Sequence, residues 1–370
     1  MSKSVNISDT TLRDGEQSPG ISFTLEEKVK ISKLLDSIGV DEIEAGIPAM
    51  CKQEKKTIKK ILDSNLKARV LGWNRAVLKD IDESLDCGLE AVVISLPVSD
   101  IHINYKLKKT KNWIIDNLKR CIDYAKKHKL YVVVGAEDAS RADFKFLLKY
   151  IKTIENCGGD RFRFCDTLGI LEPLNFYKTI KTIINRTKLE IEIHTHNDFG
   201  LATANALAGI SAGAKWVDTT VNGLGERSGN AAFEEVIMAL KHILGINLEM
   251  KIKKLIKLSE VVSKASGREI PVGKPIIGKN CFLHESGIHQ DGVIKHPSNY
   301  EPFKPLTIGK RSELVIGKHS GRSGIKAFFR LRGIELSDNR AKEILVKVRK
   351  KSSLIKRALL DKEIYSFNNT

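Results

Sequence analysis

The stretch DTTLRDGEQ (Asp9–Gln17) follows the first apolar run of the chain and decides which α/β fold the sequence encodes. Residues 5 to about 245 alternate between short apolar runs and longer segments of helical periodicity, the pattern of parallel strands joined by helices. A doubly wound sheet would need a GxGxxG fingerprint after its first strand, and Asp9–Gln17 does not contain one. The sequence therefore favours a (β/α)8 TIM barrel.

Eight candidate strands account for such a barrel, which typically takes about 250 residues. Between them, apolar residues recur at helical spacing, as in residues 31–38, 144–151 and 233–244. The predicted strands are Val5–Asp9, Asp41–Gly46, Ala68–Trp73, Ala91–Pro97, Tyr131–Glu137, Arg161–Thr167, Leu189–His196 and Trp216–Asn222.

The composition and periodicity of the sequence change after the eighth predicted strand and its helix. Residues 246–265 have helical periodicity, Gly267–Gly324 is rich in glycine and proline, and Ser337–Leu360 is helical and basic. We predict a catalytic TIM barrel over residues 1–245, a small mixed linker or lid subdomain over 246–330, and a C-terminal helical segment over 331–370.

Charge and hydropathy limit the class of protein. The chain has 62 basic and 45 acidic residues, a net charge of +17. Its lysines are spread over predicted helix surfaces, which favours a generally lysine-rich composition over a nucleic-acid footprint and is compatible with attraction for small anionic substrates. No apolar run approaches the roughly 18 residues that span a bilayer, and the N-terminus has no secretory signal. The six cysteines are scattered without a CxxC pair, as is typical of reduced thiols. We therefore predict a cytoplasmic protein with no membrane partner.

The seventh predicted strand carries the clearest site signal. In LEIEIHTHND (Leu189–Asp198) the apolar residues share one parity and should face the helices, whereas Glu192, His194 and His196 share the other and should face the barrel axis. Two histidines two residues apart on one strand face lie roughly 6.5–7 Å apart at the backbone, close enough to hold one cation. At the C-terminal end of a barrel strand, this pair indicates a metal site.

Other predicted strands direct polar groups to the same mouth. They include Glu44, Glu137 and Thr167, and the first strand leads into Arg13 and Asp14. Charged groups are unfavourable to bury together unless they bind a metal and a charged ligand. Asp14 with the two histidines forms a mixed oxygen and nitrogen set that suits a divalent ion, Mg, Mn or Zn. The loop NGLGERSGN (Asn222–Asn230) is either an anion-binding turn or a tight connection to the last helix.

These motifs resemble a known family. DTTLRDGEQ, HTHNDFGLATAN (His194–Asn205) and NGLGERSGN are similar to motifs of the DRE-TIM metallolyases, and more closely of the Claisen-condensing branch that contains 2-isopropylmalate, homocitrate and citramalate synthases. The resemblance extends into FLHESGIHQDG (Phe282–Gly292). Within the branch, EAGIPAM, GAEDASRAD and FRFCDTLGILEP most resemble homocitrate synthases of the nitrogen-fixation type.

The resemblance implies condensation of acetyl-CoA with 2-oxoglutarate, followed by thioester hydrolysis to homocitrate, in a homodimer, for synthesis of the nitrogenase iron–molybdenum cofactor. It implies these roles: Arg13, Glu137 and His289 in catalysis; Arg13, Gln17, Glu44 and Thr167 in substrate binding; Asp14, His194, His196 and Asn230 at the metal. His284 is the alternative to His289, and in the family this histidine can come from the partner subunit.

Three rival interpretations remain open at this point. The acceptor could be 2-oxoisovalerate or pyruvate, because isopropylmalate and citramalate synthases share the chemistry and differ in the oxo-acid pocket. The arginine and serine that bind the distal carboxylate in the fungal lysine-pathway enzymes correspond here to Val133 and Gly135, so that contact cannot be carried over. The enzyme could instead split a CoA thioester, although the catalytic cysteine typical of such lyases is missing. The chain could also be a basic nucleic-acid binder, whose binding would then survive moderate salt.

Overall fold

The structure is a computed structural model that describes residues 5–368. Its contacts divide the chain into two compact units, Met1–Ile270 and Pro271–Thr370. This division differs from the predicted boundaries at 245 and 330, because the helix after the barrel belongs to the first unit and the C-terminal helices share a core with the segment before them.

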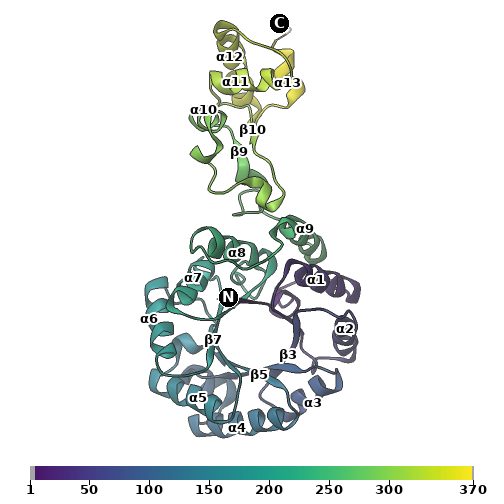
Figure 1. The fold of residues 1–370 in the computed structure, drawn as a ribbon, viewed down its shortest axis with the longest axis vertical. Helices are drawn as coiled ribbons and strands as arrows, with labels where there is room; N and C mark the ends of the chain where they lie inside the picture. Colours follow the sequence, from purple (N-terminus) through teal and green to yellow (C-terminus); the bar gives the residue numbers. More distant parts are fainter. Residues whose placement is uncertain (1–4, 369–370) are drawn as a thin grey trace. The chain divides into compact units, whose positions relative to one another are not determined.

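The first unit is a closed barrel of parallel strands in the order β1 to β8 (Figure 1), so the predicted (β/α)8 fold is confirmed. The ring closes where β1 pairs in parallel with β8, with Asn6 opposite Trp216 and Asp9 opposite Thr219. The strands are β1 (Asn6–Asp9), β2 (Glu42–Gly46), β3 (Arg69–Arg75), β4 (Ala91–Pro97), β5 (Tyr131–Glu137), β6 (Arg161–Asp166), β7 (Glu190–Thr195) and β8 (Trp216–Thr219).

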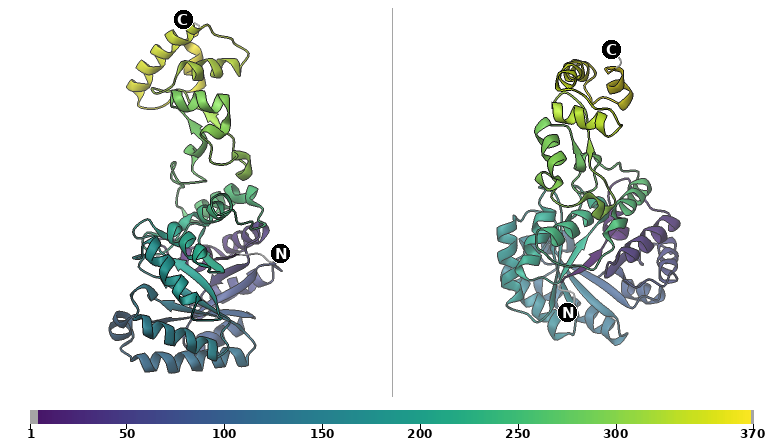
Figure 2. Two further views of the ribbon diagram at one scale, coloured as in Figure 1. Left: turned by 60° about the vertical axis from the view of Figure 1, so that its left-hand side comes forward. Right: turned by 45° about the horizontal axis from the view of Figure 1, so that its top comes forward.

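Helices surround the strands, as Figures 1 and 2 show. The first helix shows which local residues begin and end it: Thr24 and Glu27 form a capping box at its N-terminus, and Gly39 ends it with a left-handed φ of 107°. The helices of this unit are α1 (Leu25–Ile38), α2 (Lys52–Leu62), α3 (Leu78–Asp86), α4 (Lys111–Lys127), α5 (Phe144–Asn156), α6 (Pro173–Ile184), α7 (Ala202–Ala212), α8 (Phe233–His242) and α9 (Leu255–Ser266). Two π-helical turns, η1 (Thr11–Gly15) and η2 (His102–Leu107), follow β1 and β4.

The prediction for the eighth strand was wrong at its end. The strand stops at Thr219, and Asn222 has a left-handed φ of 62° in the turn that follows. Its side chain donates to the carbonyl of Ser259 on α9 and does not extend the barrel interior. The left-handed conformation, which asparagine tolerates better than most residues, breaks the extended geometry that the alternating pattern assumed.

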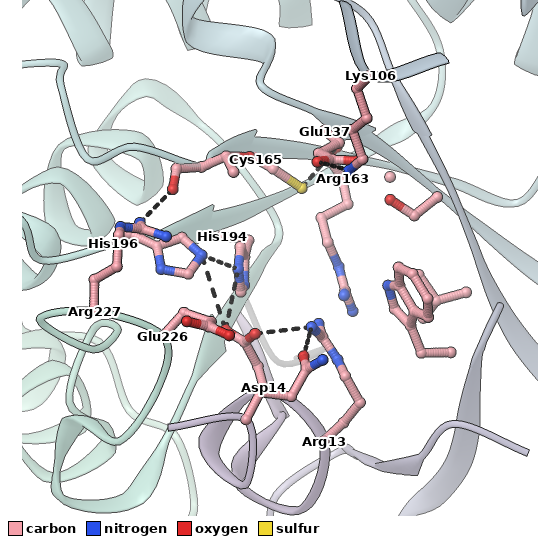
Figure 3. Close-up of a pocket in the computed structure, with 16 residues that line it drawn as sticks. Arg13, Asp14, Lys106, Glu137, Arg163, Cys165, His194, His196, Glu226 and Arg227 are labelled. Carbon is pink, nitrogen blue, oxygen red and sulfur yellow. Dashed lines mark hydrogen bonds and ion pairs between the residues drawn. The ribbon is translucent and has the colours of Figure 1, made fainter. Parts of the chain in front are cut away.

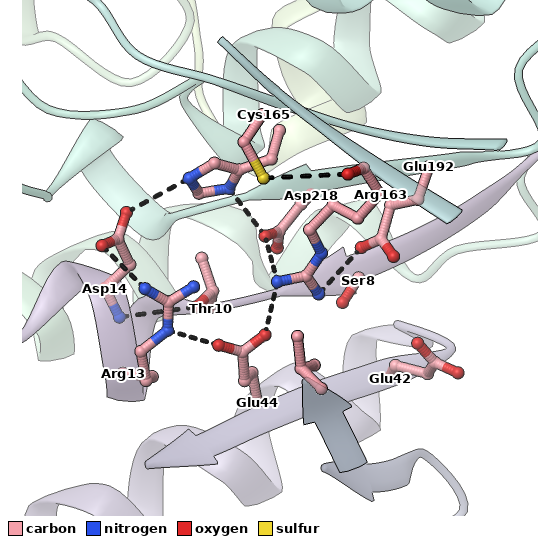
Figure 4. Close-up of polar contacts among 12 residues, drawn as sticks. Ser8, Thr10, Arg13, Asp14, Glu42, Glu44, Arg163, Cys165, Glu192 and Asp218 are labelled. Carbon is pink, nitrogen blue, oxygen red and sulfur yellow. Dashed lines mark hydrogen bonds and ion pairs between the residues drawn. The ribbon is translucent and has the colours of Figure 1, made fainter. Parts of the chain in front are cut away.

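The barrel interior has an apolar side and a charged side. Leu71, Ala91, Val93 and Val133, from β3 to β5, form an apolar cluster. Charged inward side chains from β2, β6, β7 and β8 are buried in ion pairs with one another (Figure 4). Because burying a charge without a partner is unfavourable, these pairs constrain one another, and removing one partner is expected to destabilise this half of the barrel.

The second unit has its own core of buried apolar residues from α11, α12 and α13, including Phe329, Ile344 and Val348. Its elements are β9 (Leu283–His284), α10 (Gly287–Lys295), β10 (Glu313–Leu314), α11 (Arg322–Arg330), α12 (Asp338–Ile355) and α13 (Asp361–Ser366). β9 and β10 pair in parallel. Across the described residues, no helix is long and apolar enough to cross a membrane, and all six cysteines are free.

Candidate active site

A cavity of about 330 Å³ opens at the C-terminal ends of the barrel strands (Figure 3). The predicted residues that line it are Arg13, Asp14, Gln17, Glu137, Thr167, His194 and His196. They come from η1 and the ends of β5, β6 and β7, so the fold brings together groups that lie up to 183 positions apart, from Arg13 to His196. This is the face where barrel enzymes place their active sites.

Asp14, His194 and His196 converge on one point. Their candidate ligand atoms all lie within 4.8 Å of one another, and all three residues are buried. The two histidine Nε2 atoms are 3.1 Å apart, and Asp14 Oδ2 lies 3.6 Å from that of His194 and 3.9 Å from that of His196. Two imidazoles and one carboxylate in this geometry leave coordination positions open for a substrate.

The protonation of these groups suits a cation. Asp218 Oδ2 lies 2.8 Å from Nδ1 of His194, which places the proton there and leaves the Nε2 lone pair facing the cluster. Burial and the neighbouring His194 lower the pKa of His196 to about 3, so it is neutral near pH 7. Burial opposes ionisation of Asp14, but Arg13 and the two histidines outweigh it and hold the pKa of that carboxyl below its usual range.

The charge of the buried network also fits a divalent ion. Among its buried members, three arginines face five carboxylates, so the carboxylates outnumber the cations. The arginines are Arg13, Arg161 and Arg163, and the carboxylates are Asp14, Glu42, Glu44, Glu192 and Asp218. A fourth arginine, Arg69, also pairs with Glu42, but its side chain is 44% exposed and screened by water. A cation at Asp14 would therefore add positive charge where buried carboxylates are in excess.

Arg13 is fixed between the metal cluster and the barrel interior. Its Nη1 lies 2.9 Å from Asp14 Oδ1, and its Nε donates to Glu44. Glu44 is fully buried between Arg13 and Arg163 and is not among the residues that line the cavity. Glu44 could therefore affect a substrate only through Arg13. Its predicted role in substrate binding stays a proposal.

Asn230 contacts the cluster through Asp14, to which its Nδ2 donates, while its Oδ1 is buried without a hydrogen-bond partner. The loop that presents it is strongly bent: Asn222, Gly223, Gly225, Arg227 and Gly229 all have positive φ. A Cβ on Gly229 would lie 1.9 Å from the Gly223 carbonyl oxygen, so this turn requires glycine there. The tight-turn interpretation of the loop accounts for this geometry.

The two histidines predicted after the barrel lie in the second unit. His289 is exposed on α10 and stacks on Tyr300 with ring centroids 4.0 Å apart. His284 is 7% exposed on β9, and burial lowers its pKa. The choice between them stays a prediction.

The sequence interpretation missed several groups at the site. Asp218, the partner of His194, has the inward parity on β8. It was missed because the predicted strand ran on to Asn222, so the polar residues expected at its end were Thr220 and Asn222, whereas the strand ends at Thr219, next to Asp218. Lys106 and His102 lie on η2, where neither helical nor strand periodicity applies, and no pattern signalled them.

Comparison with known proteins agrees with this geometry. A family model described as HMGL-like matches residues 4–262, and one described as homocitrate synthase post-HMGL domain-like matches residues 276–355. The 2-isopropylmalate synthase 2 of Caldanaerobacter subterraneus subsp. tengcongensis is 51% identical over 98% of this chain and 94% of its own length. Homocitrate synthase 1 of Nostoc sp. is 49% identical, over 97% and 96%.

Two further comparisons complete the picture. The (R)-citramalate synthase of Methanocaldococcus jannaschii is 44% identical over 93% of this chain and 70% of its own length. A crystal structure of the Bacillus subtilis HMG-CoA lyase superposes with a TM-score of 0.66 at 20% identity, covering 73% of this chain and 96% of that one. At that identity, the likeness shows the shared fold.

The fold, the buried metal-binding triad and these relatives together define a barrel enzyme of the class that condenses acetyl-CoA with a 2-oxo acid. The chain belongs to the HMGL-like family, in the branch that contains 2-isopropylmalate, homocitrate and citramalate synthases.

Replacing Asp218 with asparagine is expected to weaken divalent-metal affinity by about 10–100-fold, because His194 loses the carboxylate that fixes its tautomer. Isothermal titration of the metal-free chain with Mn²⁺ or Zn²⁺ measures this directly. Asp82→Asn, at a partly solvent-exposed acid on α3 that contacts Tyr124, is the control. Unchanged affinity in Asp218→Asn would contradict the role given to this carboxylate.

Proposed function

We propose that this chain is a homocitrate synthase, which condenses acetyl-CoA with 2-oxoglutarate and water to give homocitrate and CoA. Relatives named for different products have similar identities to this chain, 51% and 49%, so overall similarity does not choose the acceptor. The chemistry of the cavity wall is the better guide. For the use of homocitrate, the motif resemblance supports nitrogenase cofactor synthesis, with lysine synthesis as the alternative.

The observation that carries the proposal is Lys106. Its ammonium group lines the cavity, and Figure 3 shows it, with Glu137, across the pocket from Asp14. The wall beside it carries Ser95 and Gly135. An acceptor whose oxo acid end binds at the metal cluster would direct its far end toward this wall, where a second carboxylate would pair with the lysine that contacts Glu137 Oε1 at 2.6 Å. The side chains of 2-oxoisovalerate and pyruvate offer no charge there.

The residues of the cavity support the individual steps. A divalent ion held by Asp14, His194 and His196 supplies Lewis acidity toward a bound 2-oxo acid. Arg13, fixed by Glu44, places a permanent positive charge beside the position where an alkoxide develops. Thr167 lines the cavity, and its hydroxyl accepts from the Asp138 amide, which leaves its proton free for a substrate carboxylate.

The carbon acid in the reaction is the acetyl methyl group, and Glu137 is the proposed base. We place His289 as a second catalytic histidine, contributed by a partner copy in a homodimer. Gln17 lines the cavity with its Oε1 3.4 Å from Arg13 Nη1, so its amide group is held at the substrate end of the arginine.

A substrate panel tests the acceptor. With acetyl-CoA, we expect the highest kcat/KM for 2-oxoglutarate, measured as free CoA release by the metal-reconstituted chain. Faster turnover on 2-oxoisovalerate or pyruvate would overturn the homocitrate assignment.

Lys106→Met sharpens this test. We expect the KM for 2-oxoglutarate to rise about tenfold, since an ion pair is lost, while the KM for pyruvate changes by less than about twofold. Lys108→Met, two residues away and outside the cavity, is the matched control. An equal rise for both acceptors would show that the lysine does not recognise a second carboxylate.

A further inference from the structure

His102 lies beside the proposed base within the barrel unit. Its Nδ1 is 3.3 Å from Glu137 Oε1, and its Nε2 is 3.8 Å from Asp138 Oδ2. The imidazole ring thus stands between two consecutive carboxylates at the end of β5, with one ring nitrogen toward each. Its Nδ1 has no solvent exposure and makes no hydrogen bond of good geometry, so Glu137 is the group that can satisfy it.

Two uncommon backbone conformations meet at this ring. His102 begins the π-helical turn η2, and π-helical turns are rare and often mark functional sites. Asp138 has a left-handed backbone, φ 61° and ψ 39°, which is unfavourable for a residue other than glycine. Strain of this kind persists where the surroundings enforce it and is concentrated at functional sites.

The surroundings of Asp138 enforce its position. Its side chain is fully buried, its two carboxylate oxygens accept from Arg141, and its amide donates to Thr167 Oγ1. The carboxylate is therefore held by Arg141 at 3.8 Å from Nε2 of His102 before any substrate arrives. A fixed carboxylate near Nε2 limits how the imidazole can turn, which keeps Nδ1 directed toward Glu137.

The contacts of Glu137 are all on one oxygen. Within residues 5–368, every ion pair and hydrogen bond of this side chain involves Oε1, which lies 2.6 Å from Lys106 Nζ and 3.3 Å from His102 Nδ1. Glu137 lines the cavity, and its side chain is 23% exposed. With Oε1 occupied by the chain itself, Oε2 is the oxygen available to a substrate.

We propose that His102 is the positioning residue of Glu137: its imidazole, oriented by Asp138, holds Oε1 so that Oε2 faces the acetyl methyl group. In that step a methyl C–H bond breaks, the proton passes to Oε2, and the electron pair becomes the enolate that attacks the keto carbon. The inference rests on the proposed condensation, but not on which 2-oxo acid is the acceptor. Lys106 also contacts Oε1. If the acceptor carboxylate pairs with this lysine, His102 is the remaining contact that holds Glu137 in place.

The test uses the full metal-loaded chain with whichever of 2-oxoglutarate, 2-oxoisovalerate and pyruvate turns over fastest. We expect His102→Phe to lower kcat by about 100-fold, the usual consequence of a misplaced catalytic group, with the acceptor KM changed less than about twofold. The isotope effect on kcat with trideuterated acetyl-CoA should increase, because proton removal becomes slower relative to the other steps. A purely structural role would not move this isotope effect.

Conservative variants separate the two ring nitrogens. His102→Asn keeps a donor near the position of Nδ1, toward Glu137, and should retain most of the activity; His102→Gln keeps one near Nε2, toward Asp138, and should not. His128→Asn, at an exposed histidine at the end of α4, is the control. Wild-type kcat in His102→Phe, or equal losses in the Asn and Gln variants with an unchanged isotope effect, would overturn the inference. A wild-type chain that turns over none of the acceptors would instead refute the proposed function.

Discussion

Replacing His194 with alanine is expected to lower kcat for condensation by at least about 1,000-fold, which corresponds to about 4 kcal/mol of transition-state stabilisation. The variant loses one of three ligands in the buried cluster, and it also leaves Asp218 without its partner. His196→Ala and Asp14→Ala should have losses of the same order. CoA release under saturating substrates, with metal content measured by mass spectrometry on the same samples, checks this.

Chelation should reproduce the effect in the unaltered protein. Removing the ion takes a bound ligand from the folded state and leaves the Asp14 carboxylate without its cation, so we expect both lost activity and a lower melting temperature. Adding back a divalent ion should restore both, and the most effective ion identifies the metal. His128→Ala, far in sequence from the cluster and exposed, should behave as wild type. Full turnover of the three ligand variants, or of the chelated protein, would rule out a metal-assisted reaction.

The extent to which sequence alone anticipates this site depends on the periodicity of each element. β7 alternates regularly, so its inward histidines could be placed on the barrel axis, and the structure confirms that Glu192 and His194 are buried inside. The segment after β4 has no such period. A π-helical turn places His102 and Lys106 beside Glu137, the proposed catalytic base, and no simple sequence pattern predicts that geometry.

The sequence also did not predict which inward charged residues form ion pairs across the barrel. The sequence indicated that Glu44 and Arg163 face inward, but not that they meet, because their separation in the barrel depends on strand tilt and register. Glu44 pairs with Arg13 and does not line the cavity, so its predicted substrate-binding role stays a proposal that would act through Arg13.

A second large effect is expected in the stability of the barrel. Glu192→Gln should lower its free energy of unfolding by about 3–5 kcal/mol, because removing one partner of a buried ion pair leaves the other uncompensated. Glu192 is fully buried between two arginines: Oε2 lies 2.8 Å from Arg161 Nε, and Oε1 lies 3.0 Å from Arg163 Nη2. Both guanidinium groups are buried as well, so water cannot replace the lost charge.

Urea unfolding followed by tryptophan fluorescence measures this change in the barrel itself, because all three tryptophans, Trp73, Trp113 and Trp216, belong to the first unit. Glu190→Gln is the matched control. It lies two residues earlier on β7, is exposed, and accepts a hydrogen bond from Trp216 Nε1 that glutamine can also accept, so its change should stay within about 0.5 kcal/mol. A loss below about 1 kcal/mol in Glu192→Gln would show that the arginines are satisfied without Glu192.

The same variant distinguishes stability from positioning. Arg163 also contacts Glu44 at 2.8 Å and Asp218 at 3.5 Å, and those two carboxylates orient Arg13 and His194. If Glu192 fixes Arg163, the folded Glu192→Gln protein should show weaker metal binding and lower kcat at a temperature where it is fully native. Glu192 contacts neither the cavity nor the metal ligands, so such losses would be transmitted by the guanidinium of Arg163. Unchanged metal affinity in the variant would show that Glu192 contributes to folding alone.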